Sequence, residues 1–345
     1  MKIIEILPEL DIGGVERHVI DLSNELAERG HSVLVVSAGG KMQCQLSGKV
    51  EHRALPVQKK SLFTGYSCVR RISKWIRTEG WQIVHAHSRV PAFIAWWASH
   101  KTGIPWVYTA HACYSLNAGI VPLKHADALI CVSETVRNHL QGYIPPNSTV
   151  ITNAMPVPKV KWQHKPSEVV RFLFVGRLTP IKGLQTVIEA LALLPDSNWT
   201  LDVLGDGPLL ESLKELSVQY SLDDKINFHG YSDEVDNYML NSSCLLFPSL
   251  NEGYGLVLAR AAQIGLPAIA SNIESVTAMA GSSKGLVTPG DVMAWRDAIA
   301  EFMETNTPKI AILSSTISGI RKMVDDIEII YQQSLPIMES HYGEK

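Results

Sequence analysis

Short β-branched runs alternate with segments of helical periodicity along the first half of the chain, and this alternation restricts the fold more than any other feature. It is typical of βαβ units built around a parallel sheet. Apolar residues at helical spacing predict a helix over residues 14–28, ended by Gly30. The strands predicted in this half are residues 3–7, 32–37, 83–87, 106–110 and 128–132.

A second series of the same kind follows a proline-containing stretch from Met155 to Ser167. Prolines donate no backbone hydrogen bond, so this stretch is the predicted linker. We therefore expect an α/β protein with two Rossmann-like domains, residues 1–155 and 156–325, and a helix or tail over 326–345. An apolar stripe predicts a helix over 314–332 that packs on the second domain or crosses back to the first. The strands of the second series are predicted at residues 169–175, 200–204, 226–228, 244–247 and 268–270.

Length and composition agree with two domains. The chain has 345 residues and 46% hydrophobic residues, which is enough for two packed cores. Its five cysteines form no C-x-x-C pair and are expected to be reduced thiols of a cytosolic protein. The first apolar run is too short for a signal peptide, and no apolar stretch approaches the roughly 18 residues of a membrane span. The sequence thus predicts a cytoplasmic protein.

Charge is distributed unevenly along the chain. Residues 1–160 carry 17 Lys and Arg against 11 Asp and Glu, whereas the remainder carries 14 against 23. The basic part favours an anionic partner, such as a phospholipid surface or a phosphate-linked acceptor, and no nucleic acid is expected. Ordinary solvated surface charge explains the asymmetry equally well.

Two cations follow the first strand of the second series. That strand ends at Gly176, and the loop after it carries Arg177 and Lys182 before a predicted helix. In a parallel α/β sheet, ligands bind at the carboxyl ends of strands. Arg can grip phosphate oxygens with two donors while Lys supplies a mobile point charge, so the loop suits a diphosphate. On spacing alone, two solvated loop cations remain as good an explanation.

The stretch Val175-Gly-Arg-Leu-x-x-x-Lys-Gly183 resembles the donor-phosphate motif of the retaining glycosyltransferases of family 4, which have the GT-B fold. Further segments match the family in order over nearly the whole chain. Each is weak alone, but together they are specific. These segments are Asp11-Ile-Gly-Gly-Val-Glu-Arg17, Val84-His-Ala-His87, Tyr108-Thr-Ala-His111, Ile130-Cys-Val-Ser-Glu134, Val150-Ile-Thr-Asn153, Leu204-Gly-Asp-Gly-Pro208, Phe228-His-Gly-Tyr231, Phe247-Pro-Ser-Leu-Asn-Glu-Gly-Tyr-Gly-Leu256 and Gly285-Leu-Val-Thr-Pro-Gly-Asp291.

The resemblance implies two Rossmann-like domains facing each other across a cleft, with the acceptor on the first and the donor on the second. It implies four catalytic residues: Arg177 and Lys182 hold the diphosphate, Glu252 accepts hydrogen bonds from the donor sugar, and His111 lies near the reacting sugar. The backbone amides of Gly13 and Gly14 would approach the phosphate at a helix start. The other donor-binding candidates are Asn153, Gly176, Tyr231, Gly253, Tyr254, Gly255, Leu256 and Arg260.

In this family the anomeric configuration is retained, and the leaving phosphate is thought to help deprotonate the acceptor. No enzymic nucleophile is then required, and positioning and charge stabilisation carry the reaction. We expect no metal ion and no cofactor, because Arg177 and Lys182 can supply the positive charge. Two histidines on one strand face, His85 and His87, could form a zinc site with His111, an alternative that we consider minor.

One position departs from the family pattern. The second Glu of the acidic motif, which usually holds the donor ribose, is replaced by Arg260. An Arg cannot accept a hydroxyl proton, so it would contact a phosphate or face away. Two alternatives to a transferase stay open: a sugar-nucleotide epimerase or hydrolase, which could share the GT-B fold, and a non-catalytic carbohydrate-binding relative, which could follow from Arg260.

Residues 59–77 combine an apolar stripe of Val69, Ile72 and Ile76 with several cations and Trp75. This composition suits a helix at a membrane interface. Members of the family often act on lipid-linked acceptors, as in the synthesis of cell-envelope polysaccharide or lipopolysaccharide, which favours peripheral binding at the cytoplasmic leaflet. A helix that packs on its own domain with a basic outer face is an equally good explanation.

Overall fold

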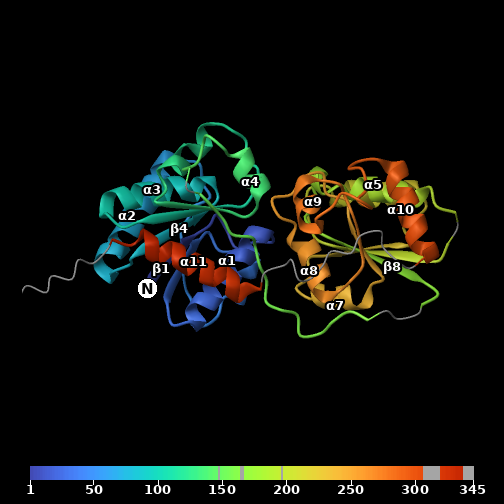
Figure 1. The fold of residues 1–345 in the computed structure, drawn as a ribbon, viewed down its shortest axis with the longest axis horizontal. Coiled ribbons are helices and arrows are strands. Elements are labelled where there is room, and N and C mark those ends of the chain that lie inside the picture. The colour runs from blue at the N-terminus through green and yellow to red at the C-terminus, as the bar shows by residue number, and fades with distance from the viewer. Residues whose placement is uncertain (147, 164–166, 196, 306–318, 337–345) are drawn as a thin grey trace, which may run out of the picture. The chain divides into compact units, whose positions relative to one another are not determined.

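The computed structural model describes residues 1–146, 148–163, 167–195, 197–305 and 319–336. They form two compact units, the first comprising Met1–Asn153 with the last helix of the chain and the second comprising Ala154–Gly319. Each unit is a parallel β-sheet flanked by helices, so the predicted pair of Rossmann-like α/β domains is confirmed (Figure 1). The boundary lies two residues before the predicted one.

The first unit contains a sheet of seven parallel strands in the order β3-β2-β1-β4-β5-β6-β7. Its strands are β1 (Lys2–Ile6), β2 (Ser32–Ser37), β3 (Glu51–Ala54), β4 (Ile83–His87), β5 (Trp106–Ala110), β6 (Ala128–Cys131) and β7 (Thr149–Val150). Its helices are α1 (Gly14–Glu28), α2 (Leu62–Glu79), α3 (Arg89–Thr102) and α4 (Glu134–His139), with 3-10 turns η1 (Lys41–Gln45) and η2 (Ala118–His125).

The second unit contains five parallel strands in the order β10-β9-β8-β11-β12. The strands are β8 (Val170–Val175), β9 (Trp199–Leu204), β10 (Ile226–Gly230), β11 (Cys244–Phe247) and β12 (Ala268–Ala270). The helices are α5 (Leu184–Ala192), α6 (Leu210–Gln219), α7 (Val235–Asn241), α8 (Leu256–Ile264), α9 (Glu274–Ala280) and α10 (Val292–Thr305), with the 3-10 turn η3 (Pro180–Lys182).

Alternate residues of the second unit's strands build two apolar cores. Phe172 and Phe174 of β8 pack with α5 and α10 on one face of the sheet, whereas Leu173 packs with α8 on the other. Successive side chains of a strand point to opposite faces, so a strand covered on both faces must be apolar throughout. This explains the continuous apolar runs from which the strands were predicted.

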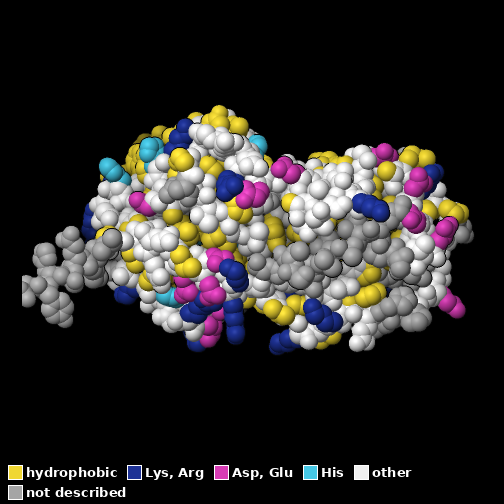
Figure 2. Space-filling view, viewed as in Figure 1, with side chains coloured by type: hydrophobic (Ala, Val, Ile, Leu, Met, Phe, Trp, Pro, Cys, Tyr) yellow, Lys and Arg dark blue, Asp and Glu magenta, His cyan; other side chains and the backbone are white. Residues whose placement is uncertain are grey.

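The last helix, α11 (Ile320–Ser334), packs on the first unit, where it lies beside α1 and β5 (Figure 1). The guanidinium of Arg29 donates to the carboxylates of Asp325 and Glu328, at 2.6 Å each. At the other end of the contact, the fully buried hydroxyl of Tyr331 donates to Glu5 at 2.9 Å. Lys, Arg, Asp and Glu side chains intermingle on the surface over this contact (Figure 2). The part of the predicted helix before residue 319 lies outside the described residues.

The order of the strands defines one topological switch point in each sheet. Along the chain, the first unit places β2 and β3 on one side of β1 and then β4 on the other. The second unit does the same around β8, with β9 and β10 on one side and β11 on the other. Loops that leave such neighbouring strands diverge at their carboxyl ends and leave room for a ligand. Among the described residues, no helix has the length and apolar content of a membrane-spanning segment.

Candidate functional site

The loops that follow β8 and β11 meet at the switch point of the second unit. Lys182, in η3 after β8, forms an ion pair with Glu252, which follows β11. The hydroxyl of Ser249 donates to the same carboxylate at 2.8 Å. A backbone hydrogen bond from Leu250 to the carbonyl of Ile181 at 2.8 Å joins the two loops directly. The structure therefore brings together two of the predicted catalytic residues.

Gly183 allows this close approach. Its φ is +69°, and a Cβ at this position would lie 2.2 Å from the carbonyl oxygen of Pro248. Any L-residue would thus be strained in its backbone and would collide with the β11 loop. The glycine of the Lys-Gly pair is required by contact between loops, while the lysine beside it supplies the charge.

Arg177 lies in the same loop but is exposed, and within the described parts of the chain its side chain makes no hydrogen bond or ion pair. The amide of the preceding Gly176 donates to the carbonyl of Leu204 at 2.9 Å, and the amide of Leu178 donates to that of Asp206 at 2.9 Å. These bonds tie the loop to the end of β9 on both sides of Arg177. The loop is held in place while the guanidinium stays available to a ligand.

The start of α8 lies at the switch point as well. Gly255 precedes the helix with φ +94°, and no side chain caps its N-terminus. The first amides of a helix have no intrahelical acceptor and favour an anion. Gly253, Tyr254 and Leu256 are partly buried around this start. Tyr231 follows β10 directly and is also partly buried.

Arg260 is engaged elsewhere. Its Nε donates to Asp236 at 2.7 Å, its Nη2 donates to the other oxygen of the same carboxylate, and its Nη1 donates to the backbone carbonyl of Pro156 at 2.6 Å. The side chain is 14% exposed. Arg260 thereby joins α8 to the start of α7 and to the segment that enters the second unit. Of the two orientations considered for it, this geometry favours the one that faces away from a phosphate.

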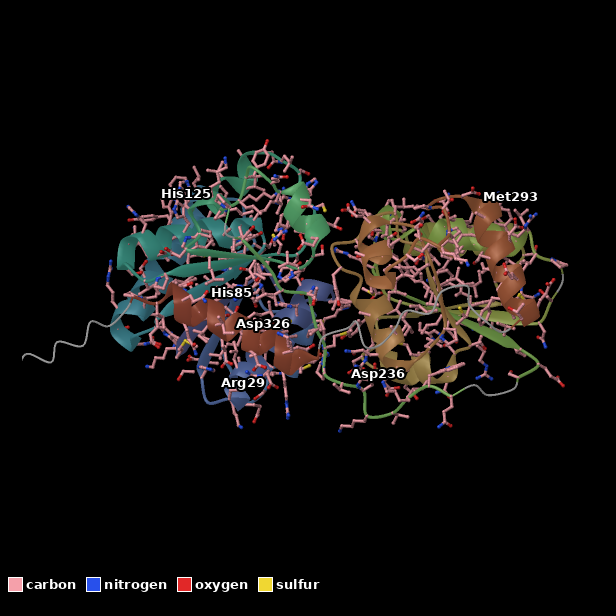
Figure 3. The ribbon with its side chains drawn as sticks, in the orientation of Figure 1. Arg29, His85, His125, Asp236, Met293 and Asp326 are labelled. Atoms are coloured by element: carbon pink, nitrogen blue, oxygen red, sulfur yellow. The ribbon has the colours of Figure 1, made fainter. Side chains whose placement is uncertain are left out.

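The first unit contains a buried group of histidines at the carboxyl ends of β4 and β5. The imidazole of His87 lies between the carboxylate of Glu5, 2.7 Å from Nε2, and the ring of predicted catalytic residue His111, 3.0 Å from Nδ1. His85, which is labelled in Figure 3, contacts the hydroxyl of Tyr331 at 2.7 Å and that of Thr109 at 2.8 Å. His111 is therefore part of a hydrogen-bonded chain that ends at a buried carboxylate.

Burial and mutual proximity alter the proton affinities in this group. Burial raises the pKa of Glu5, but the adjacent rings of His85 and His87 outweigh it and hold that pKa well below its usual range. Burial, together with the charge of His85, lowers the pKa of His87 to about 4 despite Glu5. Burial and the neighbouring histidines also keep the pKa of His111 well below the usual value. The carboxylate is thus ionised and both imidazoles are neutral at pH 7.

The structure adds His18 of α1 to this group. Its ring centroid lies 4.8 Å from that of His111, and neither of its ring nitrogens completes a hydrogen bond with the described residues. Burial and the neighbouring His87 and His85 keep the pKa of His18 well below its usual value, although Glu5 and the side chain of Asn153 act in the opposite direction. Gly13 and Gly14 begin α1 one turn earlier. Asn153, Gly13 and Gly14 thus lie in the first unit with His111.

Possible metal ligands occur here in two overlapping sets. The ligand atoms of His18, His87 and His111 lie within 4.8 Å of one another, as do those of Glu5, His85 and His87. The minor zinc alternative placed His85 with His87 and His111, whereas the structure places His18 there instead. His18 and Glu5 were not predicted. Two features of the sequence could have indicated them. Glu5 is a charged residue within the apolar run Ile3-Ile4-Glu5-Ile6, and His18 lies on the apolar face of α1.

Comparisons with known proteins agree with this geometry. Residues 12–157 match the model of Glycosyltransferase Family 4, and residues 158–322 match that of Glycosyl transferases group 1. The chain has the GT-B fold: a crystal structure of Anabaena Alr3699/HepE in complex with UDP and glucose superimposes with a TM-score of 0.83 at 20% identity, over 96% of this chain and 99% of that one. The two matched models together span almost the whole sequence, and the chain belongs to the family 4 glycosyltransferases.

The similar proteins include named enzymes. The GPI3 subunit of phosphatidylinositol N-acetylglucosaminyltransferase from Saccharomyces cerevisiae is 23% identical over 93% of this chain and 77% of its own length. The N-acetyl-alpha-D-glucosaminyl L-malate synthase of Bacillus anthracis is 23% identical over 77% of each chain. The expectation of a glycosyltransferase is confirmed.

Proposed function

We propose that this glycosyltransferase moves a sugar from a nucleotide-diphosphate donor to a glycan or lipid-linked acceptor, with retention of configuration and without a metal ion. The observation that carries the donor assignment is the ion pair of Lys182 with Glu252 at the switch point, with Arg177 exposed in the same loop and its side chain bonded to no described residue. Similar proteins support it. Structures of Alr3699/HepE were solved with UDP and glucose or with UDP-glucose, and WaaG is a glycosyltransferase involved in lipopolysaccharide biosynthesis.

The charges at the switch point suit a diphosphate. Glu252 neutralises Lys182 in the free protein, so Arg177 and the amides at the start of α8 supply the excess positive potential. A diphosphate that binds there would take over Lys182 as a partner, and Glu252 would become free to accept hydrogen bonds from sugar hydroxyls. Phosphate and sugar recognition are in this way joined through one ion pair.

Metal independence is proposed from the same two cations, whereas retention is what the family resemblance implies. The two cations would neutralise the leaving diphosphate, which is the role that a divalent ion has in other transferases. Turnover is then expected to survive EDTA, and NMR of the product is expected to show the anomeric configuration of the donor. An inverted product would reject the retaining mechanism. Release of free sugar without an acceptor would indicate a hydrolase.

The donor assignment is tested with a panel of UDP-, GDP- and ADP-sugars, measured by thermal shift and by donor turnover. One nucleotide should stabilise the protein, and this shift should disappear in Arg177→Ala and Lys182→Ala, with turnover lower by about 10²–10³. The matched control is Lys214→Ala, which removes an exposed lysine of α6 that pairs only with Glu211 in the described structure. An unchanged shift in both loop variants would reject the donor site.

We also propose that the protein is cytoplasmic and binds peripherally to an anionic membrane. The predicted apolar stripe is not what would bind, because Val69, Ile72 and Ile76 are buried in the unit, where α2 packs against α3. Support comes from the first turn of α2 instead, where Leu62 and Phe63 are 90% and 91% exposed. Exposed cations flank them and continue along the outer face of the helix: Lys59, Lys60, Arg70, Arg71, Lys74 and Arg77.

Two exposed apolar side chains within a cationic surface match the chemistry of an anionic leaflet, since the apolar tips can insert while the cations meet the headgroups. Co-sedimentation with vesicles of phosphatidylglycerol and phosphatidylcholine tests this. Binding should fall several-fold in Leu62→Ser/Phe63→Ser and should weaken with salt. The matched control is Val218→Ser, a change at another exposed apolar residue on α6. Equal binding by all variants at low salt would reject the membrane proposal.

A further inference from the structure

The buried chain from Glu5 through His87 to His111 determines where its protons lie. An ionised carboxylate can only accept hydrogen bonds. Glu5 accepts from the hydroxyl of Tyr331 at 2.9 Å and lies 2.7 Å from His87 Nε2. The proton in the second contact must therefore be on His87 Nε2. Because His87 is neutral, its Nδ1 carries no proton and is an acceptor.

The same reasoning extends to His111. Its Nε2 lies 3.0 Å from the bare Nδ1 of His87, so this contact is a hydrogen bond only if His111 Nε2 carries the proton. His111 is neutral as well, and its own Nδ1 must then be bare. Each proton position follows from the one before it, starting from the ionised carboxylate of Glu5. The tautomer of His111 is determined by a residue two hydrogen bonds away, on a different strand.

The bare Nδ1 of His111 has no partner. It is buried and makes no hydrogen bond to any described residue, and both ring nitrogens of His18 beside it are in the same condition. Buried polar atoms in folded proteins are nearly always satisfied, so several orphaned atoms in one place indicate that a polar ligand or water completes them. A lone pair on Nδ1 selects a ligand group that donates, such as a hydroxyl.

We propose that Glu5, acting through His87, fixes His111 as the Nδ1 acceptor tautomer and thereby presents a neutral imidazole lone pair to a hydroxyl group of a bound sugar. Glu5 and His87 are positioning residues, while His111 is the residue that contacts substrate. The ligand part of this inference rests on the proposed function, whereas the tautomer part concerns the free protein alone. The two parts can therefore fail separately.

Protein labelled with ¹⁵N in its histidine rings tests the tautomer directly. Long-range ¹H–¹⁵N correlation spectra distinguish a protonated from a bare ring nitrogen, and the loss of signals in His111→Gln assigns the residue. In the wild-type protein His111 should be protonated at Nε2 and bare at Nδ1 from pH 6 to pH 8. A proton on Nδ1, a doubly protonated ring, or one equivalent of tightly bound zinc on these nitrogens would overturn the proposal.

Variants connect the tautomer to activity. In Glu5→Gln the new amide can donate to His87 Nε2. The proton of His87 can then move to Nδ1, which no longer accepts from His111. His111 should then lose its single tautomer, and turnover should fall by about 10². His87→Asn keeps an acceptor near the position of Nδ1 and should retain more activity than His87→Ala. Equal losses in these two His87 variants would show that the site needs only packing there.

Tyr331→Phe is the matched structural control, because it removes a different buried hydrogen bond to Glu5 and leaves the His87 contact in place. Its melting temperature should fall, while the ¹⁵N spectrum of His111 should remain that of the wild type. A change of the His111 tautomer in this variant would mean that general loosening, not the carboxylate, controls it. If no nucleotide sugar is turned over but the tautomer is as stated, the proposed function fails and the positioning chain stands.

Discussion

Replacing Arg260 distinguishes a structural role from a nucleotide-binding role at the position where this chain departs from its family. Arg260→Leu keeps an apolar stem of similar reach but removes the fork that holds Asp236 and the carbonyl of Pro156. The geometry predicts a loss of stability, with no loss of affinity for the nucleotide. A phosphate-binding arginine would give the opposite result.

The magnitude follows from the exposure of each partner. The hydrogen bond from the guanidinium to the exposed carbonyl of Pro156 is worth about 0.5–1.5 kcal/mol when lost, because water can replace it in part. The pair with Asp236 adds on the order of 0.5 kcal/mol, because that carboxylate is 47% exposed and screened by water. The total is about 1–2 kcal/mol. For a unit of this size it corresponds to a fall in melting temperature of roughly 2–8 °C.

Thermal unfolding by circular dichroism measures the first quantity, and calorimetric titration with UDP, GDP and ADP measures the second. The matched control is Arg296→Leu, an arginine of α10 that pairs with its neighbour Asp297 on the surface and should cost less than about 0.5 kcal/mol. The nucleotide Kd should stay within about twofold in both variants. A tenfold weaker Kd with an unchanged melting temperature in Arg260→Leu would refute the structural assignment.

Three further results are expected. Gly183→Ala should lower kcat at least tenfold and destabilise the protein more than Gly265→Ala, since only the former brings a Cβ against Pro248 while both have positive φ; equal effects would contradict the steric account. Acid should destabilise the first unit, because His87, with a folded pKa of about 4, takes up a proton near pH 6.5 only when the chain is unfolded. This residue alone should lower the free energy of unfolding by about 1.4 kcal/mol per pH unit between pH 6 and 4, His18 and His111 should add to the fall, and urea titrations of His87→Asn should show a shallower dependence on pH. Arg29→Leu should speed amide exchange in α11, whereas Lys322→Leu, which removes an exposed pair within that helix, should not; unchanged exchange in both would show that Arg29 does not hold α11.

The sequence predicted the elements whose pattern is local. The helix α1 and the strands β2, β4, β5, β11 and β12 begin and end where the apolar periodicity placed them. The edge strand β3 was missed because Glu-His-Arg-Ala carries no apolar run, and it pairs only with β2. The two residues of β7 are too few to form a pattern. Strands that form through hydrogen bonds to a neighbouring strand, and not through their own apolar side chains, have no sequence pattern by which they can be predicted.

The candidate donor site could likewise be predicted where its residues follow a local pattern. Arg177, Lys182 and Glu252 belong to loops whose place at strand ends follows from the α/β pattern, and the family resemblance added their order. The partners of Arg260 were not predictable, because Asp236 is 24 residues away and meets it only through the packing of α7 on α8. Contacts of this kind depend on how helices pack, which no motif specifies.

The same limit explains why the sequence predicted only part of the histidine group of the first unit. His87 and His111 were singled out by motif, but their protonation depends on Glu5, which lies 82 residues from His87 in the chain and is brought beside it by the pairing of β1 with β4. A carboxylate in the middle of a buried strand is costly unless donors surround it. Here two imidazoles and a tyrosine from the last helix do so. The return of α11 to the first unit therefore does more than cover a sheet: it supplies Tyr331, whose hydroxyl donates to the Glu5 carboxylate beside His87.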